Sequence, residues 1–316
     1  MSLAYLLRRI GTLLLVLFGV SLVTFAIIPL LPGSPARVTL GVQATPQAVA
    51  TLERQMGLDR PLPVQYVSWI GGILTRGDFG ESLISRQPIR GEVMRRLPAT
   101  LTLALVALAI GLAIAIPAGF VSALKPGSAR DLGVSVMSQL GVSVPDFWMG
   151  ILLILLFSET LGWLPSSGYR PLSDGVVPWA RHVLLPAATV GIISGSIMAR
   201  FVRSALLEVL SQDYVRTAHA KGVSTFRVVL KHALRNALAS PITVAGLEFG
   251  RLLSGVIVIE IIFAWPGTGR LLIDSIQFRD FPIIQGLILT YAVIFALVNV
   301  AVDLSYALLD PRVTLE

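Results

Sequence analysis

Ionisable residues are few within the apolar stretches, where a charge is costly enough to indicate a function, and they include Asp146, Glu248 and Arg251. Glu248 and Arg251 are three positions apart, so on one helix they can neutralise each other as a structural ion pair. Asp146 follows Pro145 and can occupy the first turn of a half-helix, where a carboxylate is favoured, or face a cavity. Structural pairing is one reading; the other makes Asp146, Glu248 and Arg251 candidates for lining a translocation pathway.

Residue sets typical of catalysis are missing from the sequence. There is no cysteine, and the three histidines, His182, His219 and His232, are too scattered to suggest a metal cage. The sequence contains no G-x-x-x-x-G-K-[ST] phosphate loop, no H-E-x-x-H and no G-x-S-x-G. We therefore predict no catalytic residues, no metal site and no cofactor in this chain.

A polar, basic segment runs from Ser211 to Pro241 between two apolar stretches. It is typical of helix, glycine break and helix, since Gly222 suits a left-handed position after the first helix and Ser224 can cap the second. The second half places apolar side chains on one face and Arg227 with other basic residues on another. The segment is either an element that another protein grips or an ordinary basic loop that follows topology rules.

These residues must be positioned by membrane-spanning helices. The chain of 316 residues is 54% hydrophobic and 14% charged, with a mean hydropathy of +0.79, which is too apolar for a soluble domain. Crossing a bilayer takes ~20 consecutive apolar residues. The predicted fold is an all-α membrane protein with about six spans, which are Ile10–Leu31, Pro98–Leu124, Leu132–Phe157, Val183–Phe201, Pro241–Phe263 and Pro282–Leu309.

The basic residues predict the orientation of these spans. With both termini in the cytoplasm, that side holds Arg8, Arg9, Lys125, Arg130, Arg203, Arg216, Lys221, Arg227, Lys231, Arg235 and Arg312. The opposite short loops hold only Arg170, Arg181, Arg270 and Arg279. Because the basic residues are spread between the spans, the net charge of +7 indicates topology and contact with lipid headgroups, and we predict no nucleic-acid partner.

The stretch from 32 to 97 is the one sizeable extracytoplasmic region that we predict. Thr45-Pro46 opens a capped helix that ends near Gly57, and Pro63–Leu74 is a second helix. Gln87–Leu97 is amphipathic and can lie in the headgroup plane before the second span. The region can shield the spans, provide a docking surface for an external partner, or do both.

Two further features concern the spans themselves. Pro145 predicts an interruption of the third span. The pairs Gly191 with Gly195 and Gly246 with Gly250 have the spacing that lets helices approach closely, and packing is their expected use. Glu260 lies near the end of a span, where we expect its carboxylate to reach water.

Short motifs occur in order along almost the whole chain, and together they resemble one family. That family is the permease subunits of binding-protein-dependent ABC importers, in the dipeptide, oligopeptide and nickel branch, and of the type with a long external loop after the first span. The motifs are Leu58-Asp-Arg-Pro-Leu-Pro-Val-Gln-Tyr66, Gly77-Asp-Phe-Gly-Glu-Ser82, Gly162-Trp-Leu-Pro-Ser-Ser-Gly168, Glu260-Ile-Ile-Phe-Ala-Trp-Pro-Gly-Thr-Gly269, Arg279-Asp-Phe-Pro282 and Asp303-Leu-Ser-Tyr-Ala-Leu-Leu-Asp-Pro-Arg312.

The basic segment resembles the cytoplasmic coupling motif of this family, summarised as E-A-A-x-x-x-G. Gly222 falls on its glycine and Ala218 on its second alanine, while Arg216 and Thr217 replace the first two letters, as is common in the peptide branch. The predicted organisation is the N-terminus with the first span over 1–31, the extracytoplasmic region over 32–97, and a permease core over 98–316 with a coupling loop over 204–240. The ATPase-coupling residues that the resemblance implies are Tyr214, Arg216, Thr217, Ala218, Lys221, Gly222, Ser224 and Arg227.

The resemblance implies a subunit of an ATP-driven importer in the bacterial cytoplasmic (inner) membrane. Its partners would be a second homologous permease, two ABC ATPase subunits that hold ATP and Mg²⁺, and an extracytoplasmic binding protein that delivers small peptides. Nickel chelates, glutathione and oligosaccharides are alternative cargoes. A self-contained gradient-driven carrier using Asp146, Glu248 and Arg251 is a different alternative, but the inverted repeats typical of such carriers are not evident.

Overall fold

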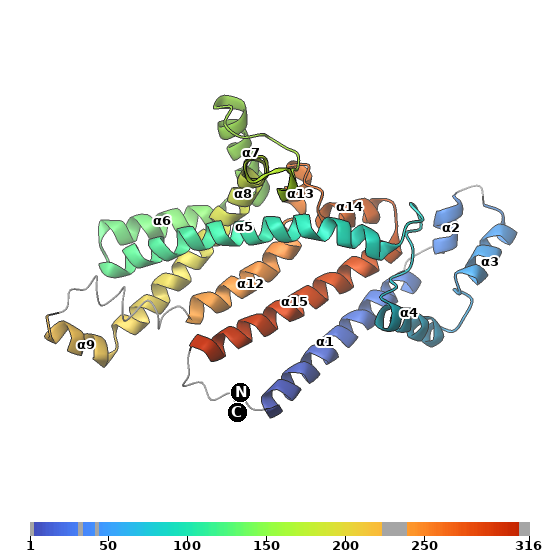
Figure 1. The fold of residues 1–316 in the computed structure, drawn as a ribbon, viewed down its shortest axis with the longest axis horizontal. Coiled ribbons are helices and arrows are strands. Elements are labelled where there is room, and N and C mark those ends of the chain that lie inside the picture. The colour runs from blue at the N-terminus through green and yellow to red at the C-terminus, as the bar shows by residue number, and fades with distance from the viewer. Residues whose placement is uncertain (1–2, 31–33, 42–43, 223–238, 310–316) are drawn as a thin grey trace. The chain divides into compact units, whose positions relative to one another are not determined.

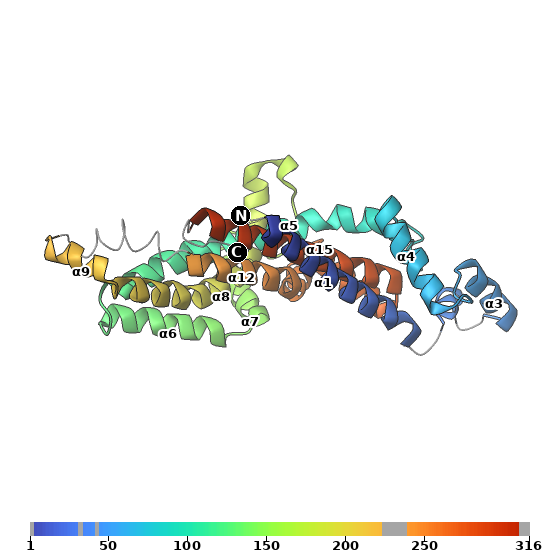
Figure 2. The ribbon, with the colours of Figure 1, turned by 90° about the horizontal axis from the view of Figure 1, so that it is seen from below.

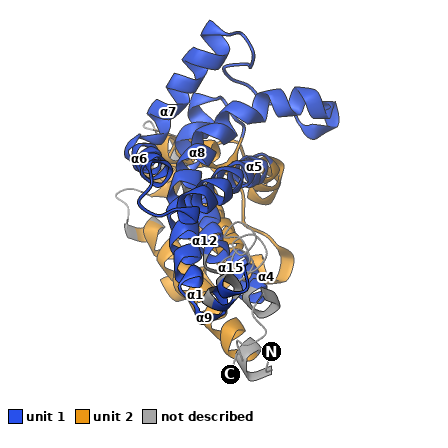
Figure 3. Cartoon of the chain, turned by 90° about the vertical axis from the view of Figure 1, so that its left-hand side faces the viewer, with its two compact units in different colours: residues 1, 99–266, 297–316 blue, residues 2–98, 267–296 orange. Residues whose placement is uncertain are grey.

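The computed structural model describes residues 3–30, 34–41, 44–222 and 239–309. Apart from one isolated bridge between Glu81 and Pro88, these residues form helices, turns and loops (Figure 1). They divide into two compact units (Figure 3). Unit 1 contains residues 99–266 and the chain from 297 onwards, and unit 2 contains residues 2–98 and 267–296.

Four described helices are long and apolar enough to cross a membrane. They are α1 (Leu3–Leu30), α5 (Ile89–Leu124), α8 (Val176–Leu210) and α15 (Phe281–Leu309). A fifth candidate is the bent pair that begins with α6 (Ala129–Ser143) and continues as α7 (Asp146–Leu153) and a π-helical turn, Ile154–Thr160. The remaining predicted span, Pro241–Phe263, falls on α12 (Ala239–Gly255) and α13 (Ile257–Ile262). The all-α membrane fold is therefore confirmed.

Pro145 interrupts the third predicted span, as expected from its missing N–H. The preceding residue, Val144, is extended, with φ −85° and ψ 126°, and Pro145 occupies the N-cap position of the new helix that starts at Asp146. The chain bends by 103° between the two halves. The predicted interruption is confirmed, and Asp146 lies in the first turn of a half-helix.

Unit 1 is organised around α8. A Cβ atom added to Gly191 would lie 2.8 Å from the carbonyl oxygen of Ala107, and one added to Gly195 would lie 2.9 Å from that of Gly111, both on α5. On another side α8 lies beside α6 (Figure 2), where a Cβ on Gly141 would overlap the side chain of Ser196. The expected use of Gly191 and Gly195 in close helix packing is confirmed.

Unit 2 contains α1, the helices of the predicted external region and α14 (Thr268–Gln277). The external helices are α2 (Pro35–Leu40), α3 (Pro46–Gln55) and α4 (Leu62–Arg76). The capped helix is confirmed, because the Thr45 side chain accepts a hydrogen bond from the Ala48 N–H at 3.3 Å. The second predicted helix corresponds to α4.

The amphipathic stretch Gln87–Leu97 is continuous with the second span and does not form an element of its own. Helix α5 begins at Ile89 and continues through Pro98 into the span. A single proline removes one backbone hydrogen bond but does not have to end a helix. Ile89 and Val93 are buried with Leu271, Ile283 and Leu287 in the core of unit 2, so this turn of α5 is held by protein contacts.

Candidate functional site

The first half of the basic segment forms α9 (Asp213–Ala220), which follows α8 after a short break. Val215 is buried, whereas Tyr214, Thr217 and Lys221 are exposed. Gly222 has a φ of +78°, the left-handed conformation that glycine adopts without a Cβ penalty. The predicted helix and glycine break are therefore confirmed.

Several predicted coupling residues are described only in part. Arg216 and Ala218 contribute their backbone to α9, but their side chains lie outside what the structure describes. Ser224 and Arg227, with the predicted second helix, also lie outside the described residues.

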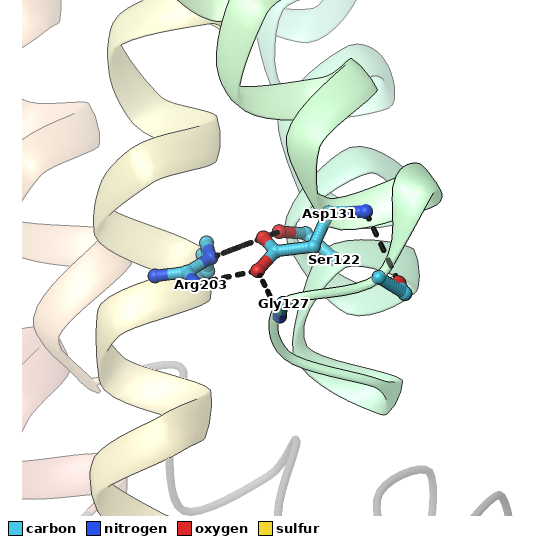
Figure 4. A network of polar contacts seen from close by, with 5 residues as sticks. Ser122, Gly127, Asp131 and Arg203 are labelled. Atoms are coloured by element: carbon cyan, nitrogen blue, oxygen red, sulfur yellow. Dashed lines mark hydrogen bonds and ion pairs between the residues drawn. The ribbon is translucent and has the colours of Figure 1, made fainter.

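A polar network ties α8 to the turn between α5 and α6, ten positions before α9 begins (Figure 4). Arg203 on α8 donates from Nε and Nη2 to the two carboxylate oxygens of Asp131, at 2.7 and 2.9 Å. Ser122 on α5 donates to the same carboxylate and accepts from Arg203 Nε at 2.9 Å. The backbone N–H of Gly127 donates to Asp131 at 2.9 Å.

This network joins three helices near the origin of α9. Asp131 is buried, and its bidentate contact with a guanidinium fixes the orientation of both side chains. From the sequence alone, Arg203 indicates only the topology of the spans. A local signal for Asp131 was present, because Ser128 three residues earlier caps α6 by accepting from the Asp131 N–H. No local pattern in the sequence indicated that Arg203, 72 positions away, is the partner of Asp131.

A second ion pair joins α12 to α8. Arg251 Nη2 lies 2.9 Å from Glu248 Oε2 and donates to Ser194 Oγ on α8 at 3.1 Å. Glu248 is buried, as is Ser194. The structural pairing expected for Glu248 and Arg251 is therefore confirmed, while their role in a pathway stays a prediction. Asp146 is half-buried, and its side chain makes no hydrogen bond or ion pair with the residues that the structure describes, so it does not join this pair.

The expectation that Glu260 reaches water is wrong. Its side chain is fully buried and accepts a hydrogen bond from Thr100 Oγ1 at 2.6 Å. Trp265 is also fully buried and donates from Nε1 to the carbonyl oxygen of Ala99 at 2.9 Å. The motif that begins at Glu260 therefore connects the end of α13 to α5. The Thr100 hydroxyl and the Ala99 carbonyl are hydrogen-bond partners of Glu260 and Trp265, whose polar groups would otherwise be costly to bury.

Two other motifs, far apart in sequence, meet in unit 2. Asp280 is buried; its carboxylate accepts from the hydroxyl of Ser82 and, at 3.0 Å, from the Leu83 N–H. Ser82 Oγ also accepts a hydrogen bond from the Ser85 N–H at 2.9 Å, within the turn that these two residues bound. Both motifs are recognisable in the sequence, but nothing in it indicates that Ser82 and Asp280 are partners.

Unit 2 also has a cavity of about 680 Å³. Its wall includes Phe25, Trp69 and Arg86. Of the predicted coupling and translocation residues that the structure describes, none lines this cavity.

Curated relatives match the chain almost end to end. A putative peptide transport system permease protein from Brucella suis is 44% identical over 310 residues, covering 98% of both chains. The di/tripeptide transport system permease protein DppB of Pseudomonas aeruginosa is 44% identical over 332 residues, again covering 98% of both. The glutathione transport system permease protein GsiC of Salmonella choleraesuis is 42% identical over 309 residues, with the same coverage.

Solved structures show the same fold at lower identity. Two inward-facing structures of the MetNI methionine ABC transporter match with TM-scores of 0.56 and 0.58 and 18% identity. They cover 69% and 70% of this chain and 96% and 97% of the matched chains. The similarity extends over more than two thirds of this chain and supports the permease fold.

Two family models account for most of the sequence. The model described as the binding-protein-dependent transport system inner membrane component matches residues 115–315, which include the Arg203–Asp131 network and α9. The model for the N-terminal part of such membrane components matches residues 2–104. This chain belongs to the family of binding-protein-dependent transport system inner membrane components.

Proposed function

We propose that the chain is the membrane-spanning permease subunit of an ATP-driven importer of small peptides, which an extracytoplasmic binding protein delivers. Membership of the family supports the transport role. Relatives named as peptide and di/tripeptide permeases, at 44% identity over almost the whole chain, support the peptide class. Because one relative is named as a glutathione transport permease, glutathione is the alternative cargo.

The proposed complex contains a second homologous permease and two ABC ATPase subunits at the cytoplasmic face. ATP and Mg²⁺ would be held by those ATPases, a proposal supported by the lack of a phosphate loop in this sequence. The chain itself would bind no cofactor. Asp146, Glu248 and Arg251 remain candidates for contacting the cargo.

The observation that carries the coupling role is the attachment of α9 to the end of α8. Because α8 packs against α5 through Gly191 and Gly195 and is held to α6 by Arg203, a force on α9 would act on several helices together. ATPases that contact α9 more favourably in their closed state would shift the permease towards one conformation. The shift can be no larger than this difference in affinity.

The test is charge reversal in the segment that starts with α9. Arg216→Glu and Lys221→Glu should abolish the stimulation of ATPase activity by the loaded binding protein, and uptake with it, while the complex stays assembled. A matched control is Lys125→Glu, an exposed basic residue in the turn before α6, which should retain both activities. Purified complex in proteoliposomes provides both measurements.

Normal coupling in both charge-reversal variants would overturn the role of this segment. Uptake by the chain alone, driven by an ion gradient without ATP, would instead support a self-contained carrier. The cargo is tested separately, by comparing dipeptides, longer peptides and glutathione as stimulators of ATPase activity in the presence of the binding protein. Stimulation by none of the peptides would overturn the peptide assignment.

A further inference from the structure

Helix α4 is longer than the external helices α2 and α3 of unit 2, and most of its residues are apolar. Its sequence, LPVQYVSWIGGILTR, contains no acidic residue, and its one charged residue is Arg76 at the last position. Arg60 lies just before its first turn, and Gly77, with a φ of +61°, ends the helix. A stretch of mostly apolar residues is thus bounded by one cation at each end.

One face of α4 packs against α1 inside the membrane span. The hydroxyl of Tyr66 lies 2.7 Å from that of Ser21, and the Tyr66 ring contacts Phe25 edge-on, with centroids 5.4 Å apart. Trp69 also contacts Phe25, at 5.9 Å. Ser21 is six residues before Ile27, the last residue of the span, so the contact lies about 9 Å along the helix from that end. Figures 1 and 2 both show α4 beside the C-terminal half of α1.

The opposite face of α4 exposes large apolar side chains. Val64, Val67 and Leu74 recur at helical spacing and are 48%, 65% and 78% exposed. Val23 on α1, near the Tyr66 contact, is similarly exposed at 68%, as expected of a side chain that faces lipid in a spanning helix.

We propose that α4 is embedded in the membrane leaflet at the C-terminal end of α1, with Val64, Val67 and Leu74 in contact with lipid acyl chains. Its apolar surface continues the lipid-facing surface of α1, because the two helices are in contact within the span. Arg60 and Arg76 are both exposed and suited to reach the phosphates of the headgroups, since long basic side chains extend from apolar surroundings towards the interface. The region from 32 to 97 therefore contributes a helix to the bilayer.

This chain has no cysteine, so an introduced cysteine is the one labelling site within this subunit and allows a direct measurement of depth. Single variants Val67→Cys and Leu74→Cys would carry a nitroxide label in the complete transporter reconstituted into phospholipid vesicles. Val23→Cys on α1 is the lipid-facing control, and Ala48→Cys, exposed on α3, is the water-facing control. Collision rates with oxygen, which concentrates in the bilayer, and with a water-soluble nickel chelate are then compared.

We expect the ratio of oxygen to nickel collisions at Val67 and Leu74 to match that at Val23 and to exceed that at Ala48 several-fold. A ratio equal to that at Ala48 would place α4 in water and overturn the proposal. Low collision rates with both reagents would show that another protein subunit covers this face, and would also overturn it. Assembly and ATPase activity of each labelled complex verify that the labels leave the structure intact.

Discussion

At the residue scale, the central interaction of unit 1 is the contact between Arg203 and Asp131. The carboxylate also accepts from Ser122 and Gly127, so its oxygen atoms have several partners although Asp131 is buried. A buried charge needs such compensation, since water cannot solvate it. The network therefore helps to hold α8 to the α5–α6 turn close to the element that we propose to be coupled to the ATPases.

Breaking this pair should destabilise the protein. Asp131→Asn or Arg203→Gln should each lower the free energy of unfolding by about 2 kcal/mol, because one polar group loses charged partners in a poorly solvated site. The double variant should lose less than the sum of the two, as expected for residues in contact. Denaturant titration of the purified complex in mixed micelles measures all three values.

Arg95→Gln is the matched control for this cycle. Arg95 is 68% exposed in its ion pair with Glu92, so its loss should cost less than ~1 kcal/mol. Additive losses at Asp131 and Arg203 would contradict the network described above.

At the element scale, close approach of helices makes α8 the common partner of several others. Gly191 and Gly195 allow α5 to approach, and Ser194 links α8 to α12 through Arg251. Contacts of this kind replace the hydrophobic driving force that is absent between helices surrounded by lipid. Movement of α8 must then involve the helices packed against it.

A methyl group at Gly191 should disturb this packing. In Gly191→Ala the added Cβ would lie 2.8 Å from the backbone oxygen of Ala107, so α5 and α8 have to separate, at a cost of about 1–3 kcal/mol. The control is Gly133→Ala on the exposed side of α6, where nothing lies within 4 Å of the added atom and stability should rise slightly. Equal effects of the two substitutions on the midpoint of thermal unfolding would contradict the close contact.

At the scale of the whole molecule, the chain is a multi-pass permease subunit of the inner membrane, and its basic residues predict which side each loop faces. Lys125 and Arg130 flank the α5–α6 turn, which predicts that this turn lies in the cytoplasm with α9. The loop between the π-helical turn, Ile154–Thr160, and α8 is predicted to face outwards. The same orientation places α9 where soluble ATPases can reach it.

Single cysteines test this orientation in the cysteine-free background. Ser173→Cys should react with a membrane-impermeant maleimide in intact spheroplasts, whereas Ala129→Cys should react only after permeabilisation, since the predicted loops lie on opposite sides. Both positions are exposed, so accessibility within the protein does not limit labelling. The reverse labelling pattern would invert the topology.

The sequence by itself determined the apolar spans, the break at Pro145, the left-handed backbone at Gly222 and the packing use of Gly191 and Gly195. These features depend on local properties: the length of an apolar stretch, a missing N–H and the absence of a Cβ atom. The ion pair of Glu248 with Arg251 could be predicted for the same reason, because a single helix sets the geometry of residues three positions apart.

Only the tertiary structure decided which distant polar groups meet. Arg203 with Asp131, Glu260 with Thr100 and Asp280 with Ser82 join residues 72, 160 and 198 positions apart. The hydrophobic periodicity of the sequence does not indicate which of these residues meet, because their pairing depends on how the helices pack after they have formed. The position of α4 against α1 was decided in the same way: hydropathy places an apolar helix near a membrane, but the Tyr66–Ser21 contact sets its depth.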